Sequence, residues 1–203
     1  MKTIPFYGHG WEANSYLIID NNEAALIDAG VPSKIVTEAL EEENAKLKYI
    51  LLTHGHFDHT VSVDALREST GAKLAVHGED EEMLSDAEKS ALALFFGRYD
   101  KIKPCDISLK GGDKIELGST EITVMHTPGH SKGSVCFLVG DSLFTGDTLF
   151  DGGYGRYDLH GGDFNKLCAS LSSLKSLDRK LEIHPGHGGS AKLGDALDCL
   201  NFI

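Results

Sequence analysis

Three histidines and an aspartate lie within six residues of this 203-residue chain, in the run HGHFDH (54–59). Imidazole nitrogen and carboxylate oxygen are donors that suit zinc and iron. His54 and His56 are two residues apart, so in an extended turn both rings can reach one ion. Asp58 and His59 follow immediately and indicate a second ion nearby. Because a regular helix would not gather all four side chains, we expect them in a loop.

Two ions need more ligands than these four, since a catalytic site takes about three protein ligands and keeps one position open. Three candidates stand out further along the chain. His130 lies in HTPGHSKGS, Asp147 in FTGDTLF and His187 in HPGHGG, each in a loop after a strand-like run. We therefore expect these three segments of the chain after residue 125 to complete the site.

The order of these motifs resembles that of the metallo-β-lactamase superfamily. THGHFDH resembles its THxHxDH signature, and TPGHSKGS, GD and PGHG resemble its later motifs, so that the resemblance runs from about residue 14 to residue 188. It implies an α/β fold, the four-layer αββα sandwich, with the site at one edge of the paired sheets. It also implies a first metal ion on His54, His56 and His130, a second on Asp58, His59 and His187, and Asp147 bridging both.

The resemblance implies a hydrolase in which a hydroxide held between two divalent ions attacks a carbonyl carbon. One ion would polarise the carbonyl oxygen, and Asp58 would orient the hydroxide or move its proton. A thioester fits this chemistry, because a thiolate leaves easily and binds zinc. Zinc is the expected ion, with iron and manganese as alternatives.

The closest group within the superfamily is that of small glyoxalase II-like hydrolases. True metallo-β-lactamases commonly have a cysteine where this chain has Asp147, and the loop GGYGRYDLHGGD resembles a GRxDLxGGD segment of the glyoxalase II-like group. Arg156 and Asp158 either position the substrate or hold this loop by an ion pair. The chain ends at Ile203, so we expect the helical extension that contacts glutathione in glyoxalase II to be largely absent, and a different thioester as substrate.

Asp28, in IDAG, resembles the IDxG segment of the same superfamily. It is either a carboxylate that orients a ligand histidine or a turn residue that caps backbone. The other five histidines lie outside the motifs and are expected to be structural or superficial, with His160 as the exception to watch because of its loop: His9, His77, His126, His160 and His184.

Two related activities and one non-catalytic role stay open. A persulfide dioxygenase of the same superfamily would share these motifs but bind one iron, and a lactonase or other ester hydrolase would use the same ligands. A metal-binding module without turnover is disfavoured by the complete ligand set. A flavodiiron role is disfavoured because that group has glutamate where this chain has His56. The sequence does not fix the oligomeric state.

Composition argues against nucleic acid and anionic membranes as partners, and we expect the partner to be a small-molecule substrate. The net charge is −12, which disfavours nucleic acid and anionic membranes because phosphate binding needs dense lysine and arginine. Residues 1–203 fit a single domain. The polar N-terminus is unlike a signal peptide and no stretch is long enough to span a membrane, so we expect a cytosolic protein. We expect its four cysteines to be reduced and mostly buried.

Secondary structure is expected as strands and turns, then alternating helices and strands. Asn21-Asn22 predicts a hairpin between residues 15–20 and 23–30, and Ser33 is the expected N-cap of a helix whose apolar face includes Ile35. Residues 79–98 read as a charged surface helix or helix pair, either a lid over the site or a solvated excursion. The remaining predictions are strands at 49–53, 73–77, 114–117, 120–126, 134–140, 142–147 and 180–184, and helices at 33–44, 61–69 and, capped by Asp163, 163–177.

Overall fold

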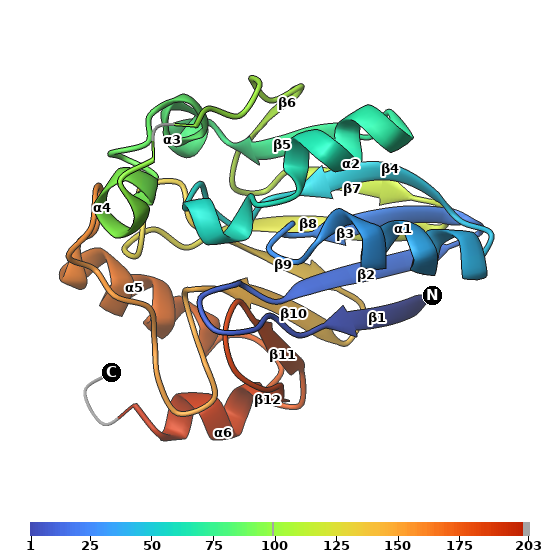
Figure 1. The fold of residues 1–203 in the computed structure, drawn as a ribbon. Helices are drawn as coiled ribbons and strands as arrows, with labels where there is room; N and C mark the ends of the chain where they lie inside the picture. Colours follow the sequence, from blue (N-terminus) through green and yellow to red (C-terminus); the bar gives the residue numbers. More distant parts are fainter. Residues whose placement is uncertain (99, 201–203) are drawn as a thin grey trace.

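The computed structural model describes residues 1–98 and 100–200, and two six-stranded sheets pack face to face in it (Figure 1). Residue 99 and residues 201–203, which the single-domain prediction includes, lie outside the described residues. The first sheet has the order β1-β2-β3-β4-β5-β6 and the second the order β12-β11-β10-β9-β8-β7. The strands are β1 (Lys2–Phe6), β2 (Ser15–Asp20), β3 (Glu23–Ile27), β4 (Lys46–Leu51), β5 (Lys73–His77), β6 (Ile107–Leu109), β7 (Lys114–Leu117), β8 (Thr120–His126), β9 (Val135–Val139), β10 (Ser142–Gly146), β11 (Glu182–Pro185) and β12 (Ala191–Lys192).

Helices cover the outer face of each sheet (Figure 1), which confirms the predicted αββα sandwich. Helices α1 and α2 pack against the first sheet, and α5 and α6 against the second. Two shorter helices, α3 and α4, lie in the segment between β5 and β6. The helices are α1 (Ser33–Glu42), α2 (Val63–Thr70), α3 (Glu81–Ser85), α4 (Leu92–Phe96), α5 (Phe164–Leu174) and α6 (Leu193–Asp198), with single 3₁₀ turns η1 at Phe57–His59 and η2 at Gly78–Asp80.

Alternate residues along a strand point to opposite faces of its sheet, so the apolar side chains of the strands are divided among three cores. In β2, Leu17 points to the core beneath the helices of the first sheet, whereas Tyr16 and Ile18 point to the core between the sheets. A third core lies between the second sheet and its helices and includes Leu167 and Leu171 of α5. Burial on both faces explains why four successive residues of β2, 16–19, are apolar.

Two predicted features, the hairpin turn after β2 and the cap of α5, are confirmed. Asn21 and Asn22 have φ of 50° and 64°, the left-handed conformation that a two-residue hairpin turn requires, and β2 and β3 pair antiparallel around them. Asp163 caps α5, because its side chain accepts a hydrogen bond from the Lys166 backbone N–H. Both features could be predicted from the sequence, because asparagine and aspartate have short polar side chains that favour turns and helix caps.

The expectation about the start of α1 was wrong, whereas the 79–98 segment holds a helix pair, one of the two forms expected for it. Pro32, not Ser33, is the N-cap residue of α1, no side chain caps it, and Ile35 is partly exposed. The 79–98 segment is broken into η2, α3 and α4, because the Asp86 side chain accepts from the backbone N–H groups of residues 88 and 89 and starts a turn instead. Strands β1, β6 and β12 and helix α6 were not predicted; they are short or lie at sheet edges.

The cysteine prediction was half right. No cysteine is disulfide-bonded, but Cys136 alone is fully buried; Cys105 and Cys168 are partly exposed and Cys199 is exposed. Burial raises the pKa of the Cys136 thiol to about 11, so this thiol is inert at neutral pH.

The topology brings the ends of several strands to one edge of the sandwich. Strands β3 and β4 run parallel in the first sheet, and β10 and β11 run parallel in the second, so the carboxyl ends within each pair lie together. The loops that carry the predicted site residues all leave these ends or that of β8. Among the described residues, no helix is long and apolar enough to cross a membrane.

Candidate metal centre

The seven predicted ligands come from four separate stretches of chain that meet at this edge. His54 and His56 follow β4, Asp58 and His59 lie on η1, and the other three follow β8, β10 and β11. Their donor atoms form three overlapping groups, within each of which the atoms lie no more than 4.8 Å apart: His54, His56 and His130; His54, His59 and Asp147; Asp58, His59 and His187.

Glycine backbone makes this close approach possible. A Cβ at Gly55 would lie 2.7 Å from the Met83 side chain, and a Cβ at Gly186 would lie 2.3 Å from Asp147 Oδ1 and 2.6 Å from His59 Cε1. Any larger residue at 186 would therefore push into the ligands. Both glycines belong to the sequence motifs, and the structure gives the reason for them: there is no space for a side chain at either position.

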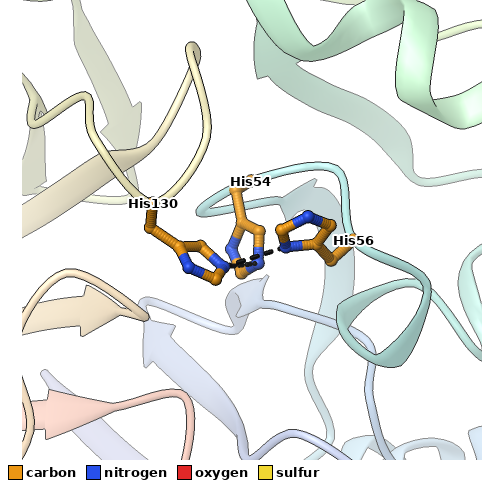
Figure 2. A group of neighbouring side chains, drawn as sticks. All are labelled: His54, His56 and His130. Atoms are coloured by element: carbon orange, nitrogen blue, oxygen red, sulfur yellow. Dashed lines mark hydrogen bonds between the residues drawn. The ribbon is translucent and has the colours of Figure 1, made fainter. Parts of the chain in front are cut away.

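Three imidazole rings converge on one point, as Figure 2 shows for His54, His56 and His130. His130 Nε2 lies 2.9 Å from His56 Nδ1 and 3.1 Å from His54 Nε2. All three side chains are buried. Three buried ring nitrogens this close to one another are the arrangement expected around a shared cation.

Hydrogen bonds on the far side of two rings fix which nitrogens carry protons. His130 Nδ1 lies 2.6 Å from the Arg156 carbonyl, which only accepts, so Nδ1 carries the proton. The Thr53 hydroxyl donates to Asp28 Oδ2 at 2.8 Å, so its oxygen accepts from His54 Nδ1 at 3.1 Å. His54 Nε2 and His130 Nε2 therefore face each other with lone pairs. Their mutual repulsion is relieved when both lone pairs bind a metal ion.

The second half of the cluster is centred on His59. His59 Nδ1 donates to Asp28 Oδ2 at 2.8 Å, and its Nε2 faces Asp147 Oδ1, 3.2 Å away. Neither of these two buried atoms has a hydrogen-bond partner, and the same is true of His56 Nε2. Buried polar atoms that face one another without a hydrogen-bond partner fit a cation between them.

Asp147 lies between the two halves. Its Oδ2 is 3.6 Å from His130 Nε2 and 3.7 Å from His187 Nε2, while Asp58 Oδ2 is 3.1 Å from His187 Nε2. The carboxylate is thus within reach of both groups of histidines. The donor set, five imidazoles and two carboxylates, fits two divalent ions of the zinc or iron type.

Burial and neighbouring charges keep several donor atoms in metal-binding form, whereas the carboxylates around His59 and His187 outweigh burial and raise the pKa of both rings, so a metal ion must displace their protons. Burial, together with the neighbouring imidazoles, lowers the pKa of His54 well below its usual value, and burial and His130 lower the pKa of His56 to about 3. Burial alone would raise the pKa of Asp147, but the adjacent His59 outweighs it and lowers that pKa, so the carboxylate is ionised. Neutral imidazole and charged carboxylate are the forms that bind metal.

Asp28 contacts the site through two residues at once. Its Oδ2 accepts from His59 and from the Thr53 hydroxyl, and its Oδ1 accepts from the Thr53 backbone N–H at 2.8 Å. Of the two roles left open for this residue, the hydrogen bonds favour the carboxylate that orients ligand histidines. Asp28 has φ of 56°, an uncommon conformation that places the carboxylate within hydrogen-bond reach of His59 and Thr53.

Sequence reasoning missed Asp80, a fully buried carboxylate that joins two ligand loops. Its Oδ2 accepts from the backbone N–H of Gly55, between His54 and His56, and from the Ser131 hydroxyl; its Oδ1 accepts from the Gly133 N–H at 2.7 Å. Asp80 thus sets the separation between the first two histidines and His130. No motif marks it, because one aspartate in an acidic segment, GEDEE, carries no signal by itself.

The Arg156 and Asp158 side chains lie at the rim of the site. Arg156 Nε and Nη2 donate to the two Asp158 oxygens at 2.7 and 2.9 Å, and both side chains are exposed. The Arg156 carbonyl accepts from His130, so the loop holds a ligand in place whether or not the guanidinium contacts substrate. Of the remaining histidines, His77 and His126 stack at 4.1 Å, His184 lies 3.1 Å from Ser190, and His160 lies 3.0 Å from Glu82.

A cavity of about 410 Å³ opens directly onto the cluster. Its floor is formed by ligand residues, among them Asp58, Asp147 and His187, so a bound molecule would reach the donor atoms from this side. Its walls are aromatic and apolar, from Trp11 and Phe57 on one side to Phe150 and Leu159 on the other.

Comparison with known proteins agrees with this geometry. The model of the metallo-beta-lactamase superfamily matches residues 10–187. The chain belongs to this superfamily. Within the metallo-beta-lactamase superfamily it is 31% identical to hydroxyacylglutathione hydrolase GloC of Haemophilus influenzae, over 91% of this chain and 89% of that protein.

Two solved structures of the superfamily are similar over nearly the whole chain. BLEG-1, a B3 metallo-beta-lactamase, is 32% identical with a TM-score of 0.91, over 97% of both chains. TTHA1623, solved in a di-iron-bound form, is 33% identical with a TM-score of 0.86, over 98% of this chain and 100% of that one. The superfamily comprises metal-dependent hydrolases among its members, and this chain keeps the donor set such a hydrolase needs.

Proposed function

We propose that the protein, acting as one domain over residues 1–203, is a dinuclear metal-dependent hydrolase of small-molecule thioesters. The observation that carries this proposal is the pair of facing lone pairs on His54 and His130, together with the buried His59 Nε2 and Asp147 Oδ1 atoms that have no hydrogen-bond partner. In the proposed ligand set, His54, His56 and His130 hold one ion, Asp58, His59 and His187 hold the other, and Asp147 bridges them. A cytosolic location stays a prediction.

Zinc is the ion we propose, because imidazole-rich sites with open positions suit it. The similarity to a di-iron-bound protein makes iron the alternative. When bound, a pair of such ions supplies a water that is ionised near neutral pH and a positive charge that stabilises an oxyanion. The aspartate at position 147 and the similarity to a hydroxyacylglutathione hydrolase support a thioester as the substrate class.

The chain's own residues would position and move the proton in this reaction. Burial would raise the pKa of Asp58, but His59 and the hydrogen bond to His187 outweigh it and lower that pKa. Asp58 is therefore ionised at neutral pH, and its side chain borders the cavity. We propose that Asp58 orients the attacking water and takes up its proton.

A thioester assay tests the proposal. Protein loaded with zinc is mixed with S-acyl thioesters, and the released thiol is trapped with a chromogenic disulfide. We expect turnover that disappears on chelation and returns with added zinc. Oxygen uptake with glutathione persulfide and no thiol release would instead indicate the mononuclear-iron dioxygenase, and turnover of lactones alone would indicate another ester hydrolase.

A further inference from the structure

The cavity above the ligands has one continuous aromatic side. Trp11, Phe57, Phe95 and Phe96 are in mutual ring contact, with centroids 5.6 Å apart for Trp11 and Phe57, 5.1 Å for Trp11 and Phe96, and 5.7 Å for Phe57 and Phe95. All four line the cavity. We refer to these four residues as the aromatic wall.

The aromatic wall leaves much of its apolar surface open. Trp11, Phe95 and Phe96 are 46%, 51% and 45% exposed, although each is a large apolar side chain. Covering such surface with an apolar group is favourable, because it removes the surface from water. Phe57 connects the wall to the metal centre, since it lies in the chain between His56 and Asp58.

The same cavity offers little to an anionic substrate. Among the described residues that line it, Arg156 is the one lysine or arginine. Its guanidinium is already paired with both Asp158 oxygens and lies 5.8 Å from the centre of the Phe95 ring.

We infer that the site selects thioesters with a large apolar group next to the scissile carbonyl, an aliphatic chain or an aromatic ring that packs on the aromatic wall. This inference rests on the proposed function and narrows its substrate class. In the reaction the oxygen of water bonds to the carbonyl carbon, the carbon–sulfur bond breaks, and the sulfur leaves with the electron pair. The products are a carboxylic acid and a thiol, which takes up one proton.

Two series of thioesters separate the acyl side from the thiol side. One series varies the acyl group from acetyl to hexanoyl and benzoyl on the neutral thiol N-acetylcysteamine, and the other varies the thiol from N-acetylcysteamine to benzyl thiol with acetyl kept constant. In one of the series we expect kcat/KM to rise at least about tenfold with the apolar group, since each buried methylene contributes to binding. Equal kcat/KM throughout both series would overturn the inference.

Substitutions on α4 provide a matched control. Phe95→Ala and Phe96→Ala remove rings of the aromatic wall, whereas Leu94→Ala removes a side chain of the same helix that is 68% exposed and is not among the described residues lining the cavity. We expect the first two variants to lower the preference for the larger group about tenfold and Leu94→Ala to leave it unchanged. An unchanged preference in both phenylalanine variants would overturn the inference.

A binding measurement separates this inference from the proposed function. Trp11 is the single tryptophan of the sequence, so its fluorescence reports ligands at the wall. The probes are 2-octanone and 2-butanone, neutral ketones that cannot be hydrolysed. We expect 2-octanone to bind at least tenfold more tightly and Phe96→Ala to remove the difference. Such binding without any thioester turnover would refute the proposed function alone; equal binding of the two ketones would refute this inference even where thioesters are hydrolysed.

Discussion

Single protons determine whether the histidine cluster can hold a cation. The ligand residues themselves could be predicted from the spacing of HGHFDH and the later motifs, because each type and position has a metal-binding reason. Their protonation could not be predicted in this way, since it depends on contacts between residues that are far apart in the chain. The hydrogen bond from the Thr53 hydroxyl to Asp28 is one such contact. Asp28 holds both His59 and, through Thr53, His54 in the tautomer that presents Nε2.

Replacing Asp28 by asparagine should therefore weaken metal binding. Asparagine tolerates the positive φ of this position, but an NH2 donor replaces one of the two accepting oxygens. This donor would face another donor, either His59 Nδ1–H or the Thr53 backbone N–H. If His59 changes tautomer, its Nε2 carries a proton toward Asp147 and can no longer bind an ion. We expect zinc affinity to fall by about 10- to 100-fold, measured by competition with a chromophoric chelator.

The control for this variant is Asp141→Asn. Asp141 is exposed and lies before β10, at the opposite end of the strand from Asp147. We expect its zinc affinity to equal that of the unmodified protein. Wild-type affinity in Asp28→Asn would refute the role given to the carboxylate.

Among the elements, the long and strongly patterned ones were predictable and the short ones were not. The hairpin at Asn21-Asn22, strand β5 and helix α5 follow from local chemistry that acts within a few residues. The segment between β5 and β6 does not, because its helices are only five residues each and their ends are set by contacts such as those of Asp86. The structural role of η2 likewise depends on Asp80 reaching two loops distant in sequence.

Replacing Asp80 by alanine should loosen the first group of ligands. The change leaves the Gly55 and Gly133 N–H groups and the Ser131 hydroxyl without their acceptor, and buried donors without partners are costly. We expect the protein to keep its circular dichroism spectrum but to bind at least one of its two ions about tenfold more weakly by calorimetric titration. Glu79→Ala, at the exposed neighbouring position, should bind both ions normally; equal affinities in the two variants would argue against a positioning role for Asp80.

At the scale of the whole molecule, three apolar cores form the sandwich, and the metal centre sits at its edge. The αββα architecture could be predicted from the order of the motifs. The division into three cores could not, because it depends on which face of its sheet each strand residue points to. The cores contain none of the ligands, so we expect the fold to persist without metal. The facing lone pairs nevertheless make the metal-free form less stable.

Removal of metal should accordingly lower the melting temperature without unfolding the protein at 25 °C. An ion present at about a thousand times its Kd stabilises the folded state by about 4 kcal/mol, and each kcal/mol shifts Tm by about 2–4 °C in a chain of this size. We expect a decrease of about 10 °C after chelation, restored by zinc and measured by scanning calorimetry. An unchanged Tm would mean that no ion stabilises this fold.

The metal content of the protein tests the central claim most directly. The chain is purified without an affinity tag that carries nickel and without added metal, and its ions are counted by mass spectrometry of the elements. We predict about two zinc or iron ions per chain in the unmodified protein and fewer in His59→Ala. One iron per chain with no second ion, or no bound metal after zinc is supplied, would contradict the dinuclear centre.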